Sequence, residues 1–379
     1  MTRLPKFLAL ATMVAGMATN ALAAVKELNA AEFTLNGKVG YYEPALKKLD
    51  GVLTKVTVSD VLASANHPTK AYSGDFNTQF TWDKQSGYDD QNTKSWYPQG
   101  LTTSSDAYDK GTVEGKDVIL ASWYSKGSSK GVRISFIDVA GKKYRNVLLV
   151  VPEEEGPSFH SVKIHAGGIM WYGDKLYVVD TANGIRIFDT SRIYEVDVGD
   201  GIGKVGSKYQ AYNYKYVIPQ WGHYLPGSKV ADSFKYSFIS LDRTTTPDSI
   251  VMGQYNETGA NNRVVRFDID ASTRTLKHTT GTTAVATKFY YFGVEKMQGA
   301  ASITVNGKSK YFFSCSRTAA NRGALVTWTE GSTADPREYS GVMSTGPEDF
   351  SYRKQTGELW TLGEHPGNRP VYGIKASDY

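Results

Sequence analysis

Apolar residues in this chain occur in short runs that are bounded by glycine, asparagine or aspartate. The stretch KLYVVDTANGIRIFD, Lys175 to Asp189, shows the pattern: two apolar runs flank the dipeptide Asn183-Gly184. Asn-Gly favours a tight hairpin because both residues tolerate positive φ, so the stretch predicts two antiparallel strands. A 3.6-residue periodicity is weak and confined to the region from Pro44 to Leu53. The chain is therefore predicted to be mainly β.

The same hairpin pattern recurs along the chain. Five copies can be aligned, at residues 118–138, 175–189, 249–270, 311–328 and 358–374. A further short strand precedes each copy, and polar and small residues mark its start; the aligned starts are Gln99, His165, Asp232, Gln298 and Glu348. Four-stranded units that repeat at intervals of roughly 50 to 67 residues are typical of a β-propeller.

A fourth, outer strand is predicted after each of the first four hairpins, at Asn146–Val151, Tyr214–Ile218, Lys288–Phe292 and Arg337–Val342. The last hairpin has none, so we expect residues 77–83 (NTQFTWD) to pair with the C-terminal unit and close the ring. This gives an all-β fold with five four-stranded blades over residues 76–379. Residues 24–75 form an N-terminal extension with a strand near 32–42 and a short helix. Six blades are the alternative, if this extension forms a degenerate blade.

Residues 1–23 resemble a secretory signal peptide. Arg3 and Lys6 precede an apolar run from Phe7 to Met17, and Ala21-Leu22-Ala23 has the small-residue pattern of a cleavage site. The run is too short for a membrane span, and no later stretch is long and apolar enough for one. The mature protein is therefore expected to be secreted, extracellular or periplasmic. A single cysteine, Cys315, excludes an intramolecular disulfide.

Charge gives little reason to expect a polyanionic partner. Without Arg3 and Lys6, 41 basic residues face 38 acidic ones, a formal charge of +3. The basic residues are scattered rather than clustered, so neither nucleic acid nor an anionic membrane is predicted as a partner.

A family resemblance follows from the second and third strands. The runs Leu-Tyr-Val-Val-Asp (176–180) and Gly-Ile-Arg-Ile-Phe-Asp (184–189), after a polar and glycine-containing inner strand, resemble secreted propellers of the broad NHL, YWTD and SMP-30/paraoxonase-like kind. The resemblance covers residues 96–379 and implies a propeller fold. Paraoxonase-like enzymes hold a central calcium with Asn, Asp and Glu side chains of inner strands, whereas Gln99, His165 and Gln298 stand at these starts here.

Antiparallel pairing places the start of each inner strand on the same face as the end of the second strand. Polar and aromatic residues are therefore expected to converge at one mouth of the channel. Sugar faces stack on Trp and Tyr, and amides and acids bond sugar hydroxyls. The predicted ligand-binding residues are Trp96, Tyr97, Gln99, His165, Trp221, His223, Gln298 and Glu364.

These features favour a secreted propeller that binds a carbohydrate or another cell-surface ligand. One alternative is an extracellular hydrolase or lyase acting on a polysaccharide or on an ester or lactone. His165 would then be the base or a metal ligand, with Asp180 or Glu348 as its carboxylate partner. A divalent cation at the channel mouth, held by His165, Gln99, Gln298 and Glu348, belongs to this alternative. A scaffold that binds another protein is the second alternative.

Overall fold

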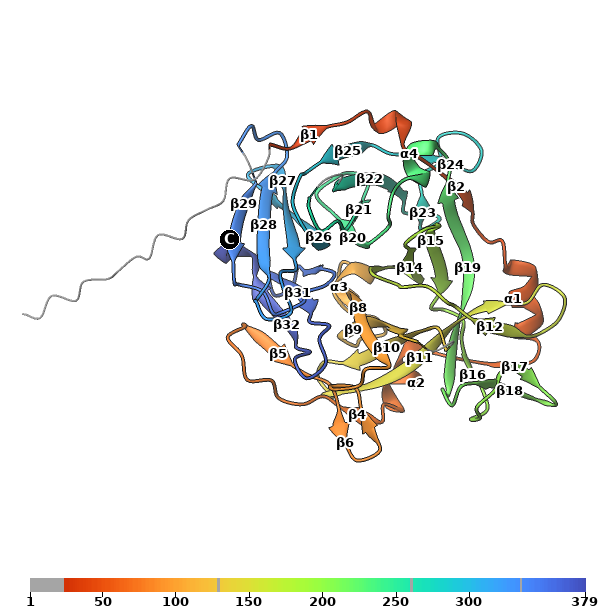
Figure 1. Cartoon of the computed structure of the whole chain (residues 1–379). Coiled ribbons are helices and arrows are strands. Elements are labelled where there is room, and N and C mark those ends of the chain that lie inside the picture. The colour runs from red at the N-terminus through yellow and green to blue at the C-terminus, as the bar shows by residue number, and fades with distance from the viewer. Residues whose placement is uncertain (1–23, 128–129, 260–261, 335) are drawn as a thin grey trace, which may run out of the picture.

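The chain forms an all-β propeller, described by a computed structural model for residues 24–127, 130–259, 262–334 and 336–379. The predicted signal peptide, residues 1–23, lies outside the described residues. Five groups of four antiparallel strands are arranged around a common centre (Figure 1). The predicted count of five blades stays a prediction, and this grouping supports it.

Each group runs from an inner strand at the centre to an outer strand at the rim. Group 1 contains β8 (Trp96–Thr103), β9 (Val118–Ser125), β10 (Val132–Asp138) and β11 (Lys143–Pro152), and group 2 contains β13 (Ile169–Tyr172), β14 (Lys175–Asp180), β15 (Gly184–Asp189) and β19 (Tyr216–Pro226). Group 3 contains β20 (Phe238–Asp242), β21 (Ser249–Gly253), β22 (Arg263–Asp270) and β25 (Lys288–Tyr291). Group 4 contains β26 (Met297–Val305), β27 (Lys308–Cys315), β28 (Ala324–Thr329) and β29 (Arg337–Ser340), and group 5 contains β30 (Ser351–Arg353), β31 (Glu358–Leu362), β32 (Val371–Lys375) and β5 (Thr78–Phe80).

The ends of the chain meet in group 5, which confirms the predicted closure. β5 supplies the outer strand, with Phe80 opposite Val371 and Thr78 opposite Gly373. A strand from the beginning of the propeller thus completes its last group. This leaves no free edge on β32, because β5 satisfies its outer hydrogen bonds.

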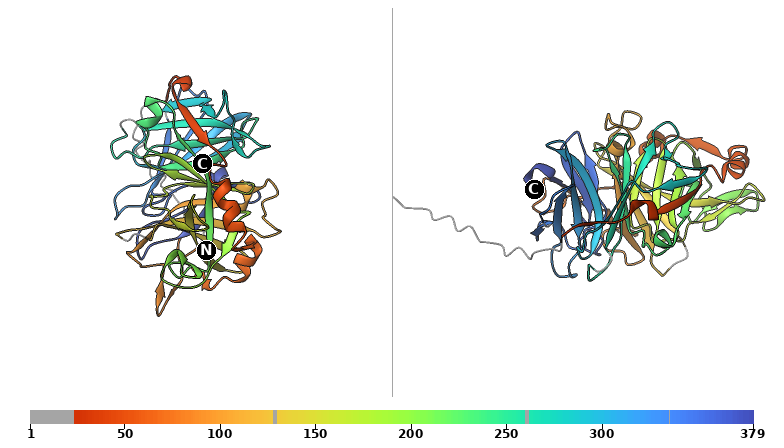
Figure 2. Two further views of the ribbon diagram at one scale, coloured as in Figure 1. Left: turned by 90° about the vertical axis from the view of Figure 1, so that its right-hand side faces the viewer. Right: turned by 90° about the horizontal axis from the view of Figure 1, so that it is seen from above.

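The N-terminal extension wraps around the outside of the ring (Figure 2, red). Its helical elements are η1 (Ala30–Glu32), α1 (Glu43–Asp50) and α2 (Val58–Ala63). Its strand β1 (Lys26–Glu27) pairs with β25, and β2 (Thr34–Lys38) pairs with β19 and with β24 (Thr283–Val285). Strand β3 (Thr54–Val56) pairs with β16 (Ile193–Glu195), and β4 (His67–Pro68) pairs with β11. Each strand therefore extends sheets of the ring, and the extension forms no four-stranded unit of its own among the described residues.

Shorter elements connect the main strands. They are α3 (Ser104–Ala107), α4 (Lys229–Asp232), η2 (Ala376–Asp378), β6 (Lys84–Gln85), β7 (Tyr88–Asp89), β12 (Phe159–Ser161), β17 (Ile202–Val205), β18 (Lys208–Ala211) and β23 (Thr275–Leu276). In the part of the chain that the structure describes, no helix is long and apolar enough to cross a membrane.

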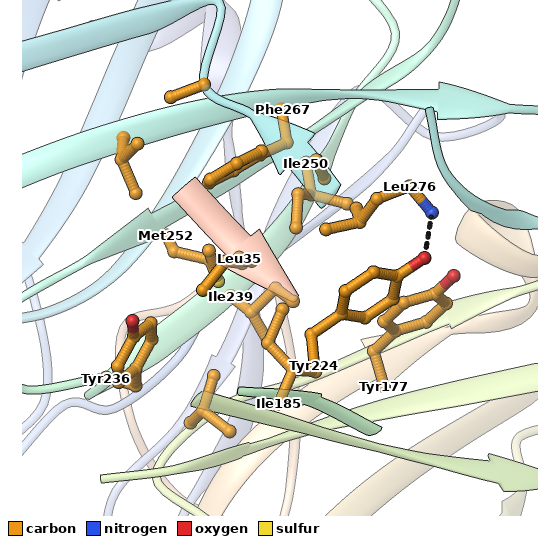
Figure 3. Packing of buried hydrophobic residues seen from close by; sticks show 14 of the residues in the cluster. Leu35, Tyr177, Ile185, Tyr224, Tyr236, Ile239, Ile250, Met252, Phe267 and Leu276 are labelled. Atoms are coloured by element: carbon orange, nitrogen blue, oxygen red, sulfur yellow. Dashed lines mark hydrogen bonds between the residues drawn. The ribbon is translucent and has the colours of Figure 1, made fainter. Parts of the chain in front are cut away.

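A large apolar cluster lies between groups 2 and 3 and includes residues of the extension. Figure 3 shows Leu35 of β2 packing among Ile185, Ile239 and Ile250. Phe33 adds edge-on contacts with Phe234 and Phe289, whose ring centroids lie 5.0 and 5.4 Å away. The extension thus buries apolar side chains in the core of the ring and acts as part of the domain.

The inner strands approach one another so closely that several positions admit only glycine. A Cβ atom on Gly168 would lie 2.5 Å from the amide nitrogen of Ile239, and one on Gly299 would lie 2.6 Å from the Cα of Asp349. A Cβ on Gly100 would lie 2.7 Å from the amide nitrogen of Ile169. These obstacles are backbone atoms of the next inner strand, which cannot swing aside.

We predict that Gly168→Ala destabilises the protein by about 1 to 3 kcal/mol, because the added methyl group forces two inner strands apart. Urea denaturation measures the free energy of unfolding. The matched control is Gly156→Ala, since a Cβ at Gly156 meets no atom within 4 Å; its effect should stay within about 0.5 kcal/mol. Equal stability of both variants would contradict the close approach.

Candidate functional site

Equivalent positions at the starts of the inner strands can be assigned from these close contacts. Gly100 lies against the backbone at Ile169, Gly168 against the backbone at Ile239, and Gly299 against the backbone at Asp349. The residues immediately before the contact positions are Gln99, Gly167, Ser237, Gln298 and Glu348. Gln99, Gln298 and Glu348 therefore occupy equivalent places, as the sequence alignment predicted.

Two of the aligned starts were wrong. Asp232 is exposed and lies in the short helix α4. Five more residues separate it from Phe238, where β20 begins, so it does not start the inner strand. His165 lies two residues before the equivalent position, Gly167, in the loop that leads into β13. The alignment took His165 because it is the last polar side chain before the glycines at 167 and 168.

Two pairs of polar side chains meet at this mouth of the channel. Gln99 Nε2 donates to Glu364 Oε2 at 3.0 Å, and Gln298 Nε2 donates to Glu348 Oε1 at 3.3 Å. Glu364 follows β31 and was predicted on this face. Four residues from three strand groups thus present amides and carboxyl groups together. We refer to Gln99, Gln298, Glu348 and Glu364, with the Tyr124 and His165 rings described below, as the mouth cluster.

Glu348 is held rigidly and is nearly removed from solvent, with 1% of its surface exposed. Its carbonyl oxygen accepts hydrogen bonds from Ser314 Oγ at 2.6 Å and Thr361 Oγ1 at 3.1 Å. Burial raises the pKa of its carboxyl group well above the ordinary value, and repulsion from Glu364 adds to the rise. Glu348 therefore keeps its proton to a higher pH than an exposed glutamate does, and in the protonated form it is able to donate a hydrogen bond or a proton.

An aromatic side chain adjoins the two carboxyl groups. The Tyr124 ring lies 4.3 Å from the His165 ring and 5.8 Å from the Tyr97 ring, centroid to centroid. Burial raises the pKa of Tyr124 to about 12, with contributions from the charges of Glu364 and Glu348. Tyr255 responds to both carboxylates too: burial raises its pKa first, and the two glutamates contribute. Both tyrosines therefore lie within electrostatic range of the two acids.

His165 is exposed, and the surrounding chain still desolvates it enough to lower its pKa. Since no charged partner causes the shift, the imidazole is mainly neutral at pH 7. Its ring contact is with Tyr124. Asp180, the predicted carboxylate partner, binds Arg186 instead, through Nε at 3.0 Å and Nη2 at 2.9 Å. Asp180 therefore fixes its own hairpin, and the structure shows no His165–Asp180 contact among the described residues.

Arg369 supports the mouth cluster from behind and had no signal in the sequence. It is fully buried and donates to three carbonyl oxygens, those of Glu364, Asp90 and Trp96, at 2.7 to 2.9 Å. Its guanidinium lies 5.2 Å from the centroid of the Tyr97 ring. Burial lowers the pKa of Arg369 to about 10. The side chain joins the loop carrying Glu364 to the start of β8.

Three of the predicted aromatic and histidine ligands lie elsewhere or face away. Trp96 begins β8, but the Arg133 guanidinium covers its ring at 4.5 Å. Trp221 and His223 lie within the outer strand β19, opposite the extension: His223 pairs with Lys38 and its ring lies 5.7 Å from that of Tyr41. β19 continues to Pro226, so these residues do not belong to a loop leading into an inner strand. The prediction that Trp221 and His223 lie in a loop at the mouth was therefore wrong, whereas Trp96 stays at the start of an inner strand.

Buried acids continue into the channel below the mouth cluster. Asp349 Oδ2 accepts a hydrogen bond from the Ile169 amide at 2.9 Å, and burial raises the pKa of this carboxyl group well above its usual value. Further along, Asp106 accepts from Thr102 Oγ1 and Ser351 Oγ, both at 2.7 Å, and burial raises its pKa as well. The channel is filled by hydrogen-bonded side chains at these levels.

Metal binding depends on which donor side chains converge. Among the residues that the structure describes, no three His, Cys, Asp or Glu side chains converge as a metal site. The mouth cluster offers two carboxyl groups with two amides, and each amide already donates to a carboxyl oxygen. The arrangement supports hydrogen bonding to a polar ligand.

Comparisons with known proteins assign no family. No protein-family model and no curated protein sequence matches the chain. Solved structures that resemble it include RS223-β-xylosidase (8% identity, 73% of this chain and 91% of that chain, TM-score 0.35) and the Dos1 propeller (10%, 74% and 73%, TM-score 0.29). An auxiliary nutrient-binding protein from Bacteroides thetaiotaomicron VPI-5482 is similar at 11% identity (79% of both chains, TM-score 0.31). No function is transferred from them, and membership of the NHL, YWTD or paraoxonase-like groups stays a prediction.

The raised pKa of Glu348 predicts a pH-dependent stability. The folded state holds a proton that the unfolded state releases above its ordinary pKa of about 4.3, so this contribution is present at low pH and lost as pH rises toward the folded pKa. Glu348→Gln, which carries no ionisable group, should therefore gain stability relative to the wild type as pH rises from about 4 to 8.

Urea denaturation across this pH range measures the difference. Glu257→Gln, at an exposed position, is the control and should give a difference that is nearly constant with pH. A constant difference for Glu348→Gln as well would contradict a buried, protonated Glu348.

Proposed function

We propose that this protein is an exported propeller that binds a carbohydrate through the mouth cluster. Export rests on the signal-peptide pattern of residues 1–23. The observation that carries the binding proposal is the convergence of two amide–carboxyl pairs beside the Tyr124 ring. Amides and carboxyl groups bond sugar hydroxyls, and a tyrosine ring receives the apolar face of a sugar.

The protonation states suit an uncharged ligand with many hydroxyl groups. A protonated Glu348 both donates and accepts hydrogen bonds, as does each glutamine amide. Glu364 accepts from Gln99 and keeps lone pairs for a ligand. Such a mixture of donors and acceptors matches a sugar ring better than it matches an anion, which the carboxyl groups would disfavour.

Binding to neutral oligosaccharides should fall roughly tenfold in Tyr124→Ala and in Gln298→Ala, since each variant removes one contact group of the mouth cluster. A glycan array identifies the ligand, and isothermal titration calorimetry measures its affinity for each variant.

His223→Ala is the control for this test, because His223 lies on the outer strand β19. Its affinity should equal that of the wild type. Loss of binding in His223→Ala with retention in Tyr124→Ala would move the site away from the mouth cluster, and a wild type that binds no glycan would refute the proposal.

Hydrolysis of a glycosidic bond is the second candidate, favoured by one observation. Glu348 is buried with its pKa raised well above the usual value, and Glu364 lies within electrostatic range of it. Glycosidases divide acid and base or nucleophile roles between two such carboxyl groups. In this scheme Glu348 donates a proton to the leaving oxygen, and Glu364 provides the carboxylate. His165 would contact the substrate beside Tyr124 rather than act with Asp180.

If the chain hydrolyses its ligand, Glu348→Gln should lower kcat by about 10² to 10⁴-fold while glycan affinity is largely kept. Release of reducing ends from polysaccharides measures turnover. Asp180→Asn serves as the comparison and should retain the catalytic rate of the wild type. Turnover that survives in both Glu348→Gln and Glu364→Gln would exclude these carboxyl groups as the reacting pair.

A further inference from the structure

A cavity of about 310 Å³ lies beside the outer strand β11 of group 1, and none of the mouth-cluster residues lines it. It lies where β4 of the extension joins β11, next to the turn before β19. The lining residues used below are His67, Tyr88, Arg133, Arg145, Tyr214 and Lys215. We refer to it as the side cavity.

A buried ionic network forms the inner wall of the side cavity. Arg133 Nη2 donates to Asp90 Oδ1 at 2.6 Å, and both residues are 3% exposed. The hydroxyls of Tyr88 and Tyr144 donate to Asp90 Oδ2 at 2.6 and 2.8 Å. The charge of Arg133 is therefore neutralised by Asp90, and the wall is fixed in position.

Two further cations at the cavity are poorly neutralised. Arg145 donates to the carbonyl oxygen of Ser64 at 3.2 Å and makes no ion pair among the described residues. Lys215 lies 3.2 Å from Glu195, whose side chain is 43% exposed, so water screens that pair. Arg145 is therefore the cation at this cavity that has no carboxylate partner among the described residues.

Two further acids near the cavity have hydrogen-bonding partners of their own. Asp83 lies 3.3 Å from His67 Nδ1, and Asp200 accepts a hydrogen bond from Asn213. Burial lowers the pKa of His67, so its imidazole adds little charge. Neither Asp83 nor Asp200 forms an ion pair with Arg145, whose guanidinium has N–H donors in the planar geometry that binds a carboxylate.

Aromatic rings and a strained turn complete the cavity. The His67 ring stacks on Tyr88 with centroids 3.6 Å apart and an interplanar angle of 13°. Tyr212 and Asn213, at the turn, have φ values of 49° and 70°. A tyrosine in this left-handed region costs free energy, and such strain is concentrated at functional sites.

From this charge, size and lining we propose that the side cavity binds a small hydroxylated carboxylic acid of monosaccharide size, a hexuronate. Arg145 and Lys215 would hold the carboxylate. The tyrosine rings and amides would contact the sugar ring. Its volume is at the lower end of ligand cavities, which suits a single sugar unit. This proposal does not depend on carbohydrate binding at the mouth cluster.

Isothermal titration calorimetry with sodium D-glucuronate tests it, and the comparison probe is D-glucose, which has a hydroxymethyl group in place of the carboxylate. Wild-type protein should bind glucuronate at least about tenfold more tightly than glucose, and the difference should shrink as salt is added. Arg145→Gln and Lys215→Gln should each weaken glucuronate binding about tenfold, and Arg145→Lys should retain part of the affinity.

Two control variants locate the binding. Lys204→Gln removes an exposed charge on β17, and Glu348→Gln alters the mouth cluster; both should bind glucuronate as the wild type does. The proposal is overturned if the wild type does not bind glucuronate, if Arg145→Gln binds it unchanged, or if Glu348→Gln abolishes the binding.

Discussion

The narrowness of the central channel is the constraint on which the rest of the structure depends. Three glycines let the inner strands touch through their backbones, and the Asp349 carboxylate reaches the Ile169 amide of group 2 from group 5. Ser122 Oγ adds a second link, since it accepts from the Gly100 amide and donates to the Ala166 carbonyl oxygen. Backbone atoms and buried acids fill the centre of the channel. The polar side chains proposed to face a ligand therefore lie one residue before each contact position of the inner strands. Gln99, Gln298 and Glu348 occupy that level.

The fold could be predicted from the sequence where its information is local. The Asn183-Gly184 turn needs positive φ, and Gly184 adopts 90°. Alternating apolar runs fixed the hairpins, and the unpaired last hairpin indicated that an N-terminal strand would close the ring. It was harder to predict which residue of one repeat is equivalent to which residue of the next. In group 3 the contact position is Phe238 rather than glycine, so nothing in the sequence distinguishes it from neighbouring positions.

The candidate site was predicted only in part, for a related reason. Gln99, Gln298, Glu348 and Glu364 follow from strand order, and the structure brings them together. Tyr124 and Arg369 do not, because they reach the mouth from a second strand and from a loop between β31 and β32, where side-chain direction is set by packing. Trp221 and His223 were misplaced because β19 is eleven residues long, and its continuation could not be separated from a following loop.

A structure of the protein with a bound oligosaccharide tests the central claim most directly, because it locates the ligand without relying on variants. The account predicts sugar hydroxyls within hydrogen-bond distance of Glu348 or Gln298, and a sugar ring against Tyr124. A saccharide bound on the outer strands or along the extension, with the mouth cluster empty, would contradict it.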